Sequence, residues 1–201
     1  MLGTITPLGE RGRGNTRWFR VALTYIASAS VSGALVGTVL AVSGLALTAL
    51  THWSGRAMLW PALAFAALAV LLDVRGQAAR VPHFRRQVNS YWPGEMRPWA
   101  YAVGFGSQLG LGFTTHVVSA VTYAAFLCAF FSHDVLIGLT IGASFGFVRG
   151  MLVMLTRGVT SPSALIAMHT RVSSAERHSR RVLHLASAAV IALVALSAAL
   201  T

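Results

Sequence analysis

The chain has 201 residues, of which 55% are hydrophobic and only 10% are charged, and its mean hydropathy is +0.66. Soluble domains carry about 25% charged residues, so this composition excludes an ordinary soluble protein and predicts an all-α integral membrane protein, built as a bundle of transmembrane helices. The net charge of +11 comes from 16 basic residues, all of them arginine, and 5 acidic ones. Because the arginines lie in blocks between apolar runs, we expect the lipid bilayer as partner, and no nucleic acid.

Residues 1–20 are rich in glycine and arginine and are expected to form a cytoplasmic tail. The apolar run that follows, 21–50, is longer than the roughly 20 residues that cross a bilayer, and it is the first expected span. Gly33 and Gly37 belong to a stripe of small residues at four-residue intervals, which lets another helix approach closely. Trp18, just before this span, is expected at the level of the lipid headgroups.

A second and shorter span is expected at 57–72, with Pro61 in its first turns, where proline is best tolerated. After a polar segment, the third apolar run covers 99–131. This run is too long for a simple crossing, so it must tilt, break or begin as an interfacial helix. Gly106 and Gly110 give its first half a face with almost no side chains.

The fourth span, 135–156, has a glycine at every fourth position, which is the most regular pattern in the sequence. Such a helix has one bare face, and we expect that face to pack on another helix. A short surface helix is expected in the polar segment that follows, at 163–172, before a fifth span at 182–200. The four glycines are Gly138, Gly142, Gly146 and Gly150.

The arginine blocks predict the orientation of these five spans. The segments before the first span, after the second and after the fourth hold 4, 5 and 5 arginines, whereas the loops on the opposite side hold only Arg56. Positively charged loops stay in the cytoplasm, so the N-terminus is expected inside and the C-terminus outside. Residues 21–201 are then a single multi-pass transmembrane domain.

Polar residues inside the third and fourth spans are the candidate substrate-binding residues. At about 1.5 Å per helical residue, Gln108 lies roughly 13 Å and Arg149 roughly 10 Å from the cytoplasmic ends of their spans. The two side chains are therefore expected at similar depth, and they form one polar cluster if the glycine faces of the two spans pack together. Ionisable residues at this depth are functional candidates because their burial in lipid is costly. The candidates are Gln108, Thr114, Thr115, His116 and Arg149.

Each candidate also has a purely structural interpretation. Arg149 can extend its charged end to the cytoplasmic headgroups, and His116 can hydrogen-bond a neighbouring helix. Thr114 and Thr115 can bond the carbonyls of their own helix. The sequence leaves these alternatives open.

The sequence predicts no cofactor and no metal. Its seven histidines lack the paired spacing of a dedicated metal site, and the five acidic residues all lie at or outside the ends of the spans. The single cysteine, Cys128, cannot form an intramolecular disulfide and is best explained as a small packing residue. We therefore expect no enzyme activity.

The run 104–155, in which glycine-rich helices flank Thr-Thr-His at 114–116, resembles the second half of the thiol-disulfide interchange and cytochrome c biogenesis transmembrane family. That family has a Thr-Pro-Cys element at the corresponding place. The resemblance covers 21–155 and implies a helical scaffold in the plasma membrane of a prokaryote, that is, the inner membrane where there are two. The first two spans are similar to the family's second and third helices through Gly33, Gly37 and Gly44.

The departure from this family concerns its chemistry. Family members carry reducing equivalents across the membrane through a cysteine pair, and Cys128 alone cannot do so. The resemblance therefore implies the scaffold without the redox relay.

The leading interpretation is a membrane protein that binds or moves a small solute around Gln108, His116 and Arg149. The alternative is a non-catalytic structural or accessory subunit, whose glycine-rich faces dock onto a partner membrane protein or a second copy of the chain. A third interpretation is a redox protein that pairs Cys128 with a cysteine of a partner.

Overall fold

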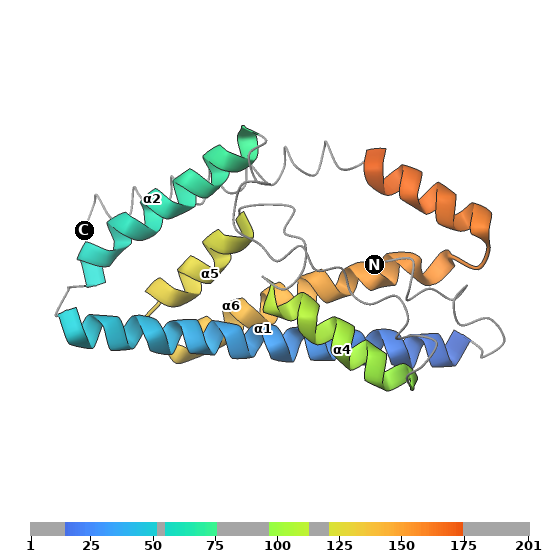
Figure 1. Cartoon of the computed structure of the whole chain (residues 1–201), viewed down its shortest axis with the longest axis horizontal. Coiled ribbons are helices and arrows are strands. Elements are labelled where there is room, and N and C mark those ends of the chain that lie inside the picture. The colour runs from blue at the N-terminus through green and yellow to red at the C-terminus, as the bar shows by residue number, and fades with distance from the viewer. Residues whose placement is uncertain (1–14, 52–54, 76–96, 113–120, 175–201) are drawn as a thin grey trace.

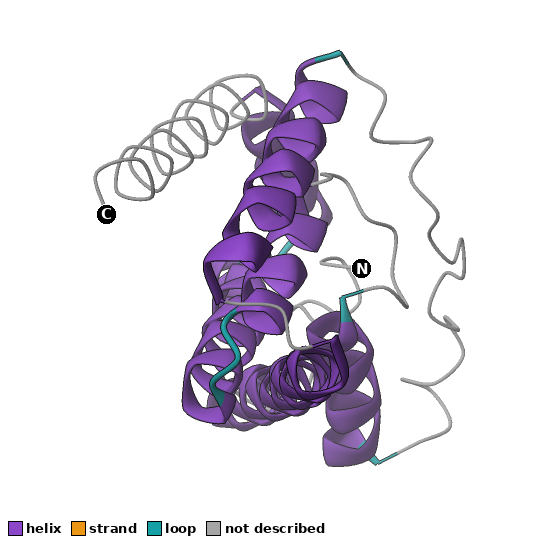
Figure 2. Cartoon of the chain, turned by 90° about the vertical axis from the view of Figure 1, so that its left-hand side faces the viewer, coloured by secondary structure: helices purple, strands orange, loops and turns teal. Residues whose placement is uncertain are grey.

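The described part of the protein is helical throughout. The computed structural model describes residues 15–51, 55–75, 97–112 and 121–174, and in these ranges it contains no strand (Figure 1, Figure 2). The expected all-α class is confirmed for this part of the chain, while the expected fifth span at 182–200 lies outside it. The helices are α1 (Asn15–Thr51), α2 (Gly55–Val74), α4 (Pro98–Leu111), α5 (Val121–Phe131), α6 (Val135–Met151) and the 3-10 helix η2 (Leu152–Gly158), and a further helix covers residues 162–174.

Helix α1 runs the length of the molecule, and the other helices pack along it (Figure 1). Its 37 residues span about 55 Å at 1.5 Å per residue. The helix begins at Asn15, so residues 15–20 of the expected tail are helical. Buried positions recur every three or four residues, which is the spacing of one helix face. These positions include Trp18, Ala22, Tyr25, Ala29, Gly33, Gly37 and Ala41.

Helix α6 packs antiparallel against this buried face of α1 through backbone-to-backbone contacts. A methyl group added at Gly142 would lie 3.0 Å from the backbone nitrogen of Gly37 and closer still to the carbonyl oxygen of Gly33. Further along, Gly138 lies on Gly37 and Ala41, whereas Gly146 and Gly150 lie on Ala29 and Ile26. Only residues without a side chain permit this approach, so the four-residue repeat of α6 is explained by its partner α1.

Helix α4 packs on α1 in the parallel direction. Gly106 faces the carbonyl of Tyr25, and Gly110 faces the carbonyl of Ala29 one turn later. Ser28 joins the same contact, because its hydroxyl oxygen lies 3.0 Å from the carbonyl oxygen of Tyr25 and 3.4 Å from that of Ala102. The bare faces of α4 and α6 are thus both turned to α1, not to each other.

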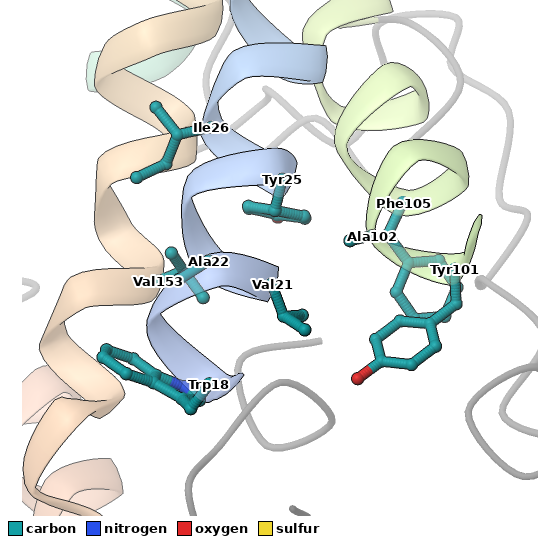
Figure 3. Close-up of a cluster of buried hydrophobic side chains, with 9 residues drawn as sticks. All are labelled: Trp18, Val21, Ala22, Tyr25, Ile26, Tyr101, Ala102, Phe105 and Val153. Atoms are coloured by element: carbon teal, nitrogen blue, oxygen red, sulfur yellow. The ribbon is translucent and has the colours of Figure 1, made fainter. Parts of the chain in front are cut away.

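A compact apolar cluster closes the end of the bundle at which α1 begins (Figure 3). Trp18, which was expected at the level of the lipid headgroups, is buried with an exposed fraction of only 1%, in one cluster with Val153 of η2. On the other side of α1, Tyr101 and Phe105 of α4 cover Val21 and Tyr25. The cluster consists of Trp18, Val21, Ala22, Tyr25, Ile26, Tyr101, Ala102, Phe105 and Val153.

The long apolar run 99–131 does not form one helix. Helix α4 ends at Leu111, and Gly112 follows it with a positive φ of 77°. Helix α5 then leads to a tight connection in which the Asp134 carboxylate accepts hydrogen bonds from the backbone N–H groups of Leu136 and Ile137, at 2.7 and 3.0 Å. This N-cap starts α6. Of the three alternatives for this run, the structure therefore shows the break.

Among the described residues, two helices are long and apolar enough to cross a membrane, namely Arg17–Thr51 and Val135–Gly158. A third apolar segment, Leu63–Leu72 within α2, is shorter. In each of the two long helices only 22% of the most apolar window is buried inside the protein, so most of their apolar side chains face outward. On α1 this outward face includes Val31 and Leu35.

Positive charge gathers at one end of the bundle. Because α1 and α4 are parallel and α6 is antiparallel to both, the starts of α1 and α4 and the end of η2 lie at the same end (Figure 1). We call this end, where Arg17, Arg20, Arg97 and Arg157 are found, the basic end. Asp134 lies at the opposite end, at the start of α6.

The contact between α1 and α6 predicts the effect of adding one methyl group. Gly142→Ala forces the two backbones apart, and we expect it to destabilise the protein by about 1–3 kcal/mol, as overpacking does elsewhere. Gly158→Ala is the matched control, because nothing lies within 4 Å of a methyl group at that position. Thermal unfolding of the purified protein in detergent should show a lower melting temperature for Gly142→Ala only. Equal melting temperatures would contradict the backbone contact.

Candidate solute-binding site

The interrupted end of α4 is the centre of the candidate site. The backbone N–H of Gly112 donates a hydrogen bond of 3.2 Å to the carbonyl oxygen of Leu109, which closes the last turn of the helix. The positive φ of Gly112 is a conformation that side chains disfavour, so glycine is the natural residue for this C-cap. The rings of Phe126 and Phe145 pack against Gly112, and their centroids are 5.1 Å apart in an edge-to-face arrangement.

Arg149 of α6 reaches the same helix end. Its Nη1 atom donates a hydrogen bond of 3.3 Å to the carbonyl oxygen of Leu109, so this carbonyl accepts from both Arg149 and Gly112. The guanidinium carbon lies 5.3 Å from the centre of the Phe145 ring, one helical turn earlier in α6. A cation is favourable at the C-terminus of a helix because the unpaired carbonyls there carry partial negative charge.

Arg149 therefore points into the bundle in this structure. Extension of its side chain to the cytoplasmic headgroups was the structural alternative considered from the sequence, and the bond to Leu109 runs across to α4 instead. Arg149 lies nine positions before Gly158, the last residue of η2, which corresponds to about 17 Å along the helix axis at the α-helical and 3-10 rises of about 1.5 and 2.0 Å per residue. Tyr25, buried on α1, is close enough to interact electrostatically with the guanidinium.

Helix packing on α1 creates this meeting of α4 and α6. Gly110 of α4 and Gly146 of α6 both lie against the carbonyl of Ala29. Three backbones therefore converge at one level of the bundle. Arg149 follows Gly146 by one turn, and Leu109 precedes Gly110, so the convergence brings the guanidinium within hydrogen-bonding distance of the end of α4.

The other sequence-derived candidates fall into two groups. Gln108 is half-buried on α4, next to Leu109, and so belongs to the same level of the bundle as Arg149. Thr114, Thr115 and His116 follow the break of α4 directly in sequence, and they lie outside the described residues.

Sequence reasoning missed three residues that shape the site. Gly112 was not among the residues singled out from the sequence, although a glycine at the end of an apolar helical stretch is a recognised C-cap signal. Phe145 precedes Arg149 by four positions, the spacing at which two side chains on a helix touch. Phe126 has no comparable signal, because its contact with Phe145 joins two different helices.

The described residues contain no group of three or more histidine, cysteine or acidic side chains that would hold a metal ion. Cys128 is exposed on α5, and none of the contacts that build the Arg149 site involves it. The chemistry at the break of α4 is therefore that of a cation, helix carbonyls and aromatic rings.

These features define the structural class of the protein. It is a helical bundle in which a cation caps an interrupted apolar helix. Comparison of the chain with protein-family models, with curated proteins and with solved structures found no match. The geometry at Arg149 and Leu109 is therefore the basis for the functional conclusion.

The cap at Gly112 predicts a coupled effect of two substitutions. Gly112→Ala adds a side chain at positive φ, which costs about 1–3 kcal/mol, and it also pushes a methyl group into the Phe126 ring. We expect Phe126→Ala to destabilise the wild type more than it destabilises Gly112→Ala, because the smaller side chain relieves that clash. Melting temperatures of the wild type, both single variants and the double variant test this. Strictly additive shifts would mean that Phe126 does not pack on the cap.

Proposed function

We propose that the chain is a multi-pass membrane protein with five spans near 21–50, 57–72, 99–131, 135–156 and 182–200. The outward-facing apolar side chains of α1 and α6 support this proposal, because they would be unfavourable in water. The basic end supports a cytoplasmic N-terminus, since arginines accumulate on the cytoplasmic side. On this proposal the break of α4 divides the third span into two helical halves within the membrane.

The proposed topology predicts the outcome of a reporter fusion. Alkaline phosphatase is active only outside the cytoplasm, whereas green fluorescent protein fused at the same point is fluorescent inside. We expect an active phosphatase and weak fluorescence for fusions after residue 201, and the opposite for fusions after residue 174. The reverse pattern at residue 201 would remove the fifth span and place both termini inside.

We further propose that this protein binds or moves a small solute at the interrupted end of α4. The observation that carries the proposal is the hydrogen bond from Arg149 to the Leu109 carbonyl. On the proposed topology, this bond sets a charged group at bilayer depth against the end of a broken helix. Transporters commonly place their sites at discontinuous helices near the middle of the membrane. A charge at that depth costs too much to be retained on a lipid-facing surface.

The chemistry of the site indicates what kind of solute fits. A guanidinium has five N–H donors in a planar fork, so Arg149 can cap α4 and contact an oxygen atom of a solute at the same time. Gln108, half-buried at the same level, adds an amide that can both donate and accept. His116 follows Gly112 by four positions in sequence and stays a proposed contact of the solute. A small solute with oxygen acceptors suits this set.

The accessory-subunit interpretation receives less support from the packing. Its glycine faces were expected to dock onto a partner, and here Gly106, Gly110, Gly142 and Gly146 lie against α1 of the same chain. A partner would therefore have to use other surfaces. The proposed scaffold remains of the thiol-interchange type without its relay, and α4 ends at Leu111, three positions before Thr114.

Cysteine accessibility tests the solute site without knowledge of the solute. Single cysteines are placed at Gln108, His116 and Arg149 in a Cys128→Ser background, and Val148→Cys provides the matched control. Val148 is next to Arg149 in sequence but its side chain is 64% exposed on the outer face of α6, where the bilayer would cover it. A sulfonated, membrane-impermeant maleimide should label the first three positions and leave the control unlabelled.

The outcome of this labelling decides between the two interpretations. A hydrated site gives labelling at Gln108, His116 and Arg149 from the cytoplasmic side, or from both sides if the solute crosses. Protection of all three would mean a dry helix interface, and the solute function would then be abandoned in favour of the structural subunit.

A further inference from the structure

An apolar groove lies at the basic end, between η2 and a helix that covers residues 162–174. The sequence analysis expected this helix at 163–172, and the structure confirms it (Figure 1). The groove has a volume of about 380 Å³ and lies away from the Arg149 site. Its walls include Leu155, Gly158 and Val159 on one side and Met168, Arg171 and Val172 on the other.

The local sequence explains why the chain turns here. The 3-10 helix ends at Gly158, and Val159 is buried with its N–H bonded to the carbonyl of Thr156 at 2.9 Å. Ser161 then caps the next helix, accepting a 3.2 Å hydrogen bond from the N–H of Ala164, and Pro162 occupies the first helical position. The turn is built from these fixed elements, so the groove between the two helices is part of the fold.

The groove continues the lipid-facing surface of α6. Val148, Leu152 and Leu155 have exposed fractions of 64%, 49% and 57%. They follow one another by one turn, first in α-helical and then in 3-10 spacing, so they form one apolar stripe. The stripe leads from the proposed membrane-spanning part of α6 to Leu155, which is itself a wall of the groove.

Two arginines lie near the end of this apolar stripe. Arg171 lines the groove, and the exposed Arg157 lies in the last turn of η2 beside it. The apolar walls suit an acyl chain, and a guanidinium is well suited to bind phosphate oxygens in a bidentate manner. Both requirements are met by one molecule that the bilayer itself supplies.

We propose that this groove binds one anionic phospholipid, with an acyl chain along Val148, Leu152 and Leu155 and its phosphate at Arg171. The inference rests on the proposed membrane location but not on the proposed solute. The headgroup charge distinguishes this lipid from zwitterionic ones. A bound lipid of this kind would hold the end of α6 and the helix over 162–174 at the cytoplasmic surface.

Native mass spectrometry of the full chain in detergent tests this inference. Three probes are added in turn: phosphatidylglycerol, phosphatidylcholine with the same acyl chains, and glycerol 3-phosphate, which is a headgroup without chains. We expect one phosphatidylglycerol per chain, weaker retention of phosphatidylcholine and no retention of glycerol 3-phosphate. Arg171→Gln should weaken phosphatidylglycerol binding about fivefold, since one arginine near the membrane surface contributes about that factor.

Two further variants separate the groove from general charge attraction. Gly158→Phe places a ring in the groove, and it should fold normally because the position is open, yet lose the bound lipid. Arg75→Gln removes one exposed positive charge at the end of α2, outside the groove, and should bind as the wild type does. Melting temperatures of these variants exclude misfolding as the cause of a loss.

Three results would overturn the proposal. Equal binding of the two lipids would show that the groove does not select an anionic headgroup, and unchanged binding by Gly158→Phe would place the lipid elsewhere. A mass of two chains without lipid would identify a second copy as the occupant. Lipid binding that persists while Gln108, His116 and Arg149 are protected from labelling would overturn the solute function alone.

Discussion

The approach of two helices to the carbonyl of Ala29 is the constraint on which the rest of the structure depends. Gly110 of α4 and Gly146 of α6 lie against this carbonyl from different sides, and no residue with a side chain fits at either position. Close backbone contact is also the interaction that remains available in lipid, where the hydrophobic effect does not drive helices together. Helix α4 runs parallel and α6 antiparallel to α1, so the arginines near the starts of α1 and α4 and the end of η2 lie at one end of the bundle.

The same convergence makes the interrupted helix α4 tolerable. A helix that ends inside a membrane leaves carbonyls without partners, and each of these is costly to bury. Here the Leu109 carbonyl accepts hydrogen bonds from Gly112 and Arg149. The cation gains from the negative end of the helix dipole and from the Phe145 ring. Structural cap and binding group are compatible roles for one guanidinium, and this is why the break and Arg149 are best understood together.

The two ends of α6 are connected to the rest of the structure in different ways. Asp134 starts the helix with an N-cap, while the other end passes through η2 into a turn and a helix over residues 162–174. Since the apolar stripe of α6 reaches that turn, a lipid bound there would couple the position of the surface helix to that of α6. Arg149 lies on the same helix, so the proposed lipid and the proposed solute would act on one rigid element.

For the part of the chain that the structure describes, the sequence by itself determined the helical class and the apolar helices expected at 21–50, 57–72 and 135–156, because hydropathy and glycine spacing are properties of local segments. The run 99–131 forms two helices, α4 and α5, and the expected span at 182–200 lies outside the described residues. The sequence also determined the basic blocks and the surface helix near 163–172. Only the tertiary structure decided which faces meet. The glycines of α4 and α6 both turn to α1, Trp18 is buried inside the bundle, and Arg149 reaches Leu109. A bare face can be recognised from the sequence of one helix. The helix that packs on it depends on how all the backbones approach one another, and the sequence of a single segment does not determine that approach.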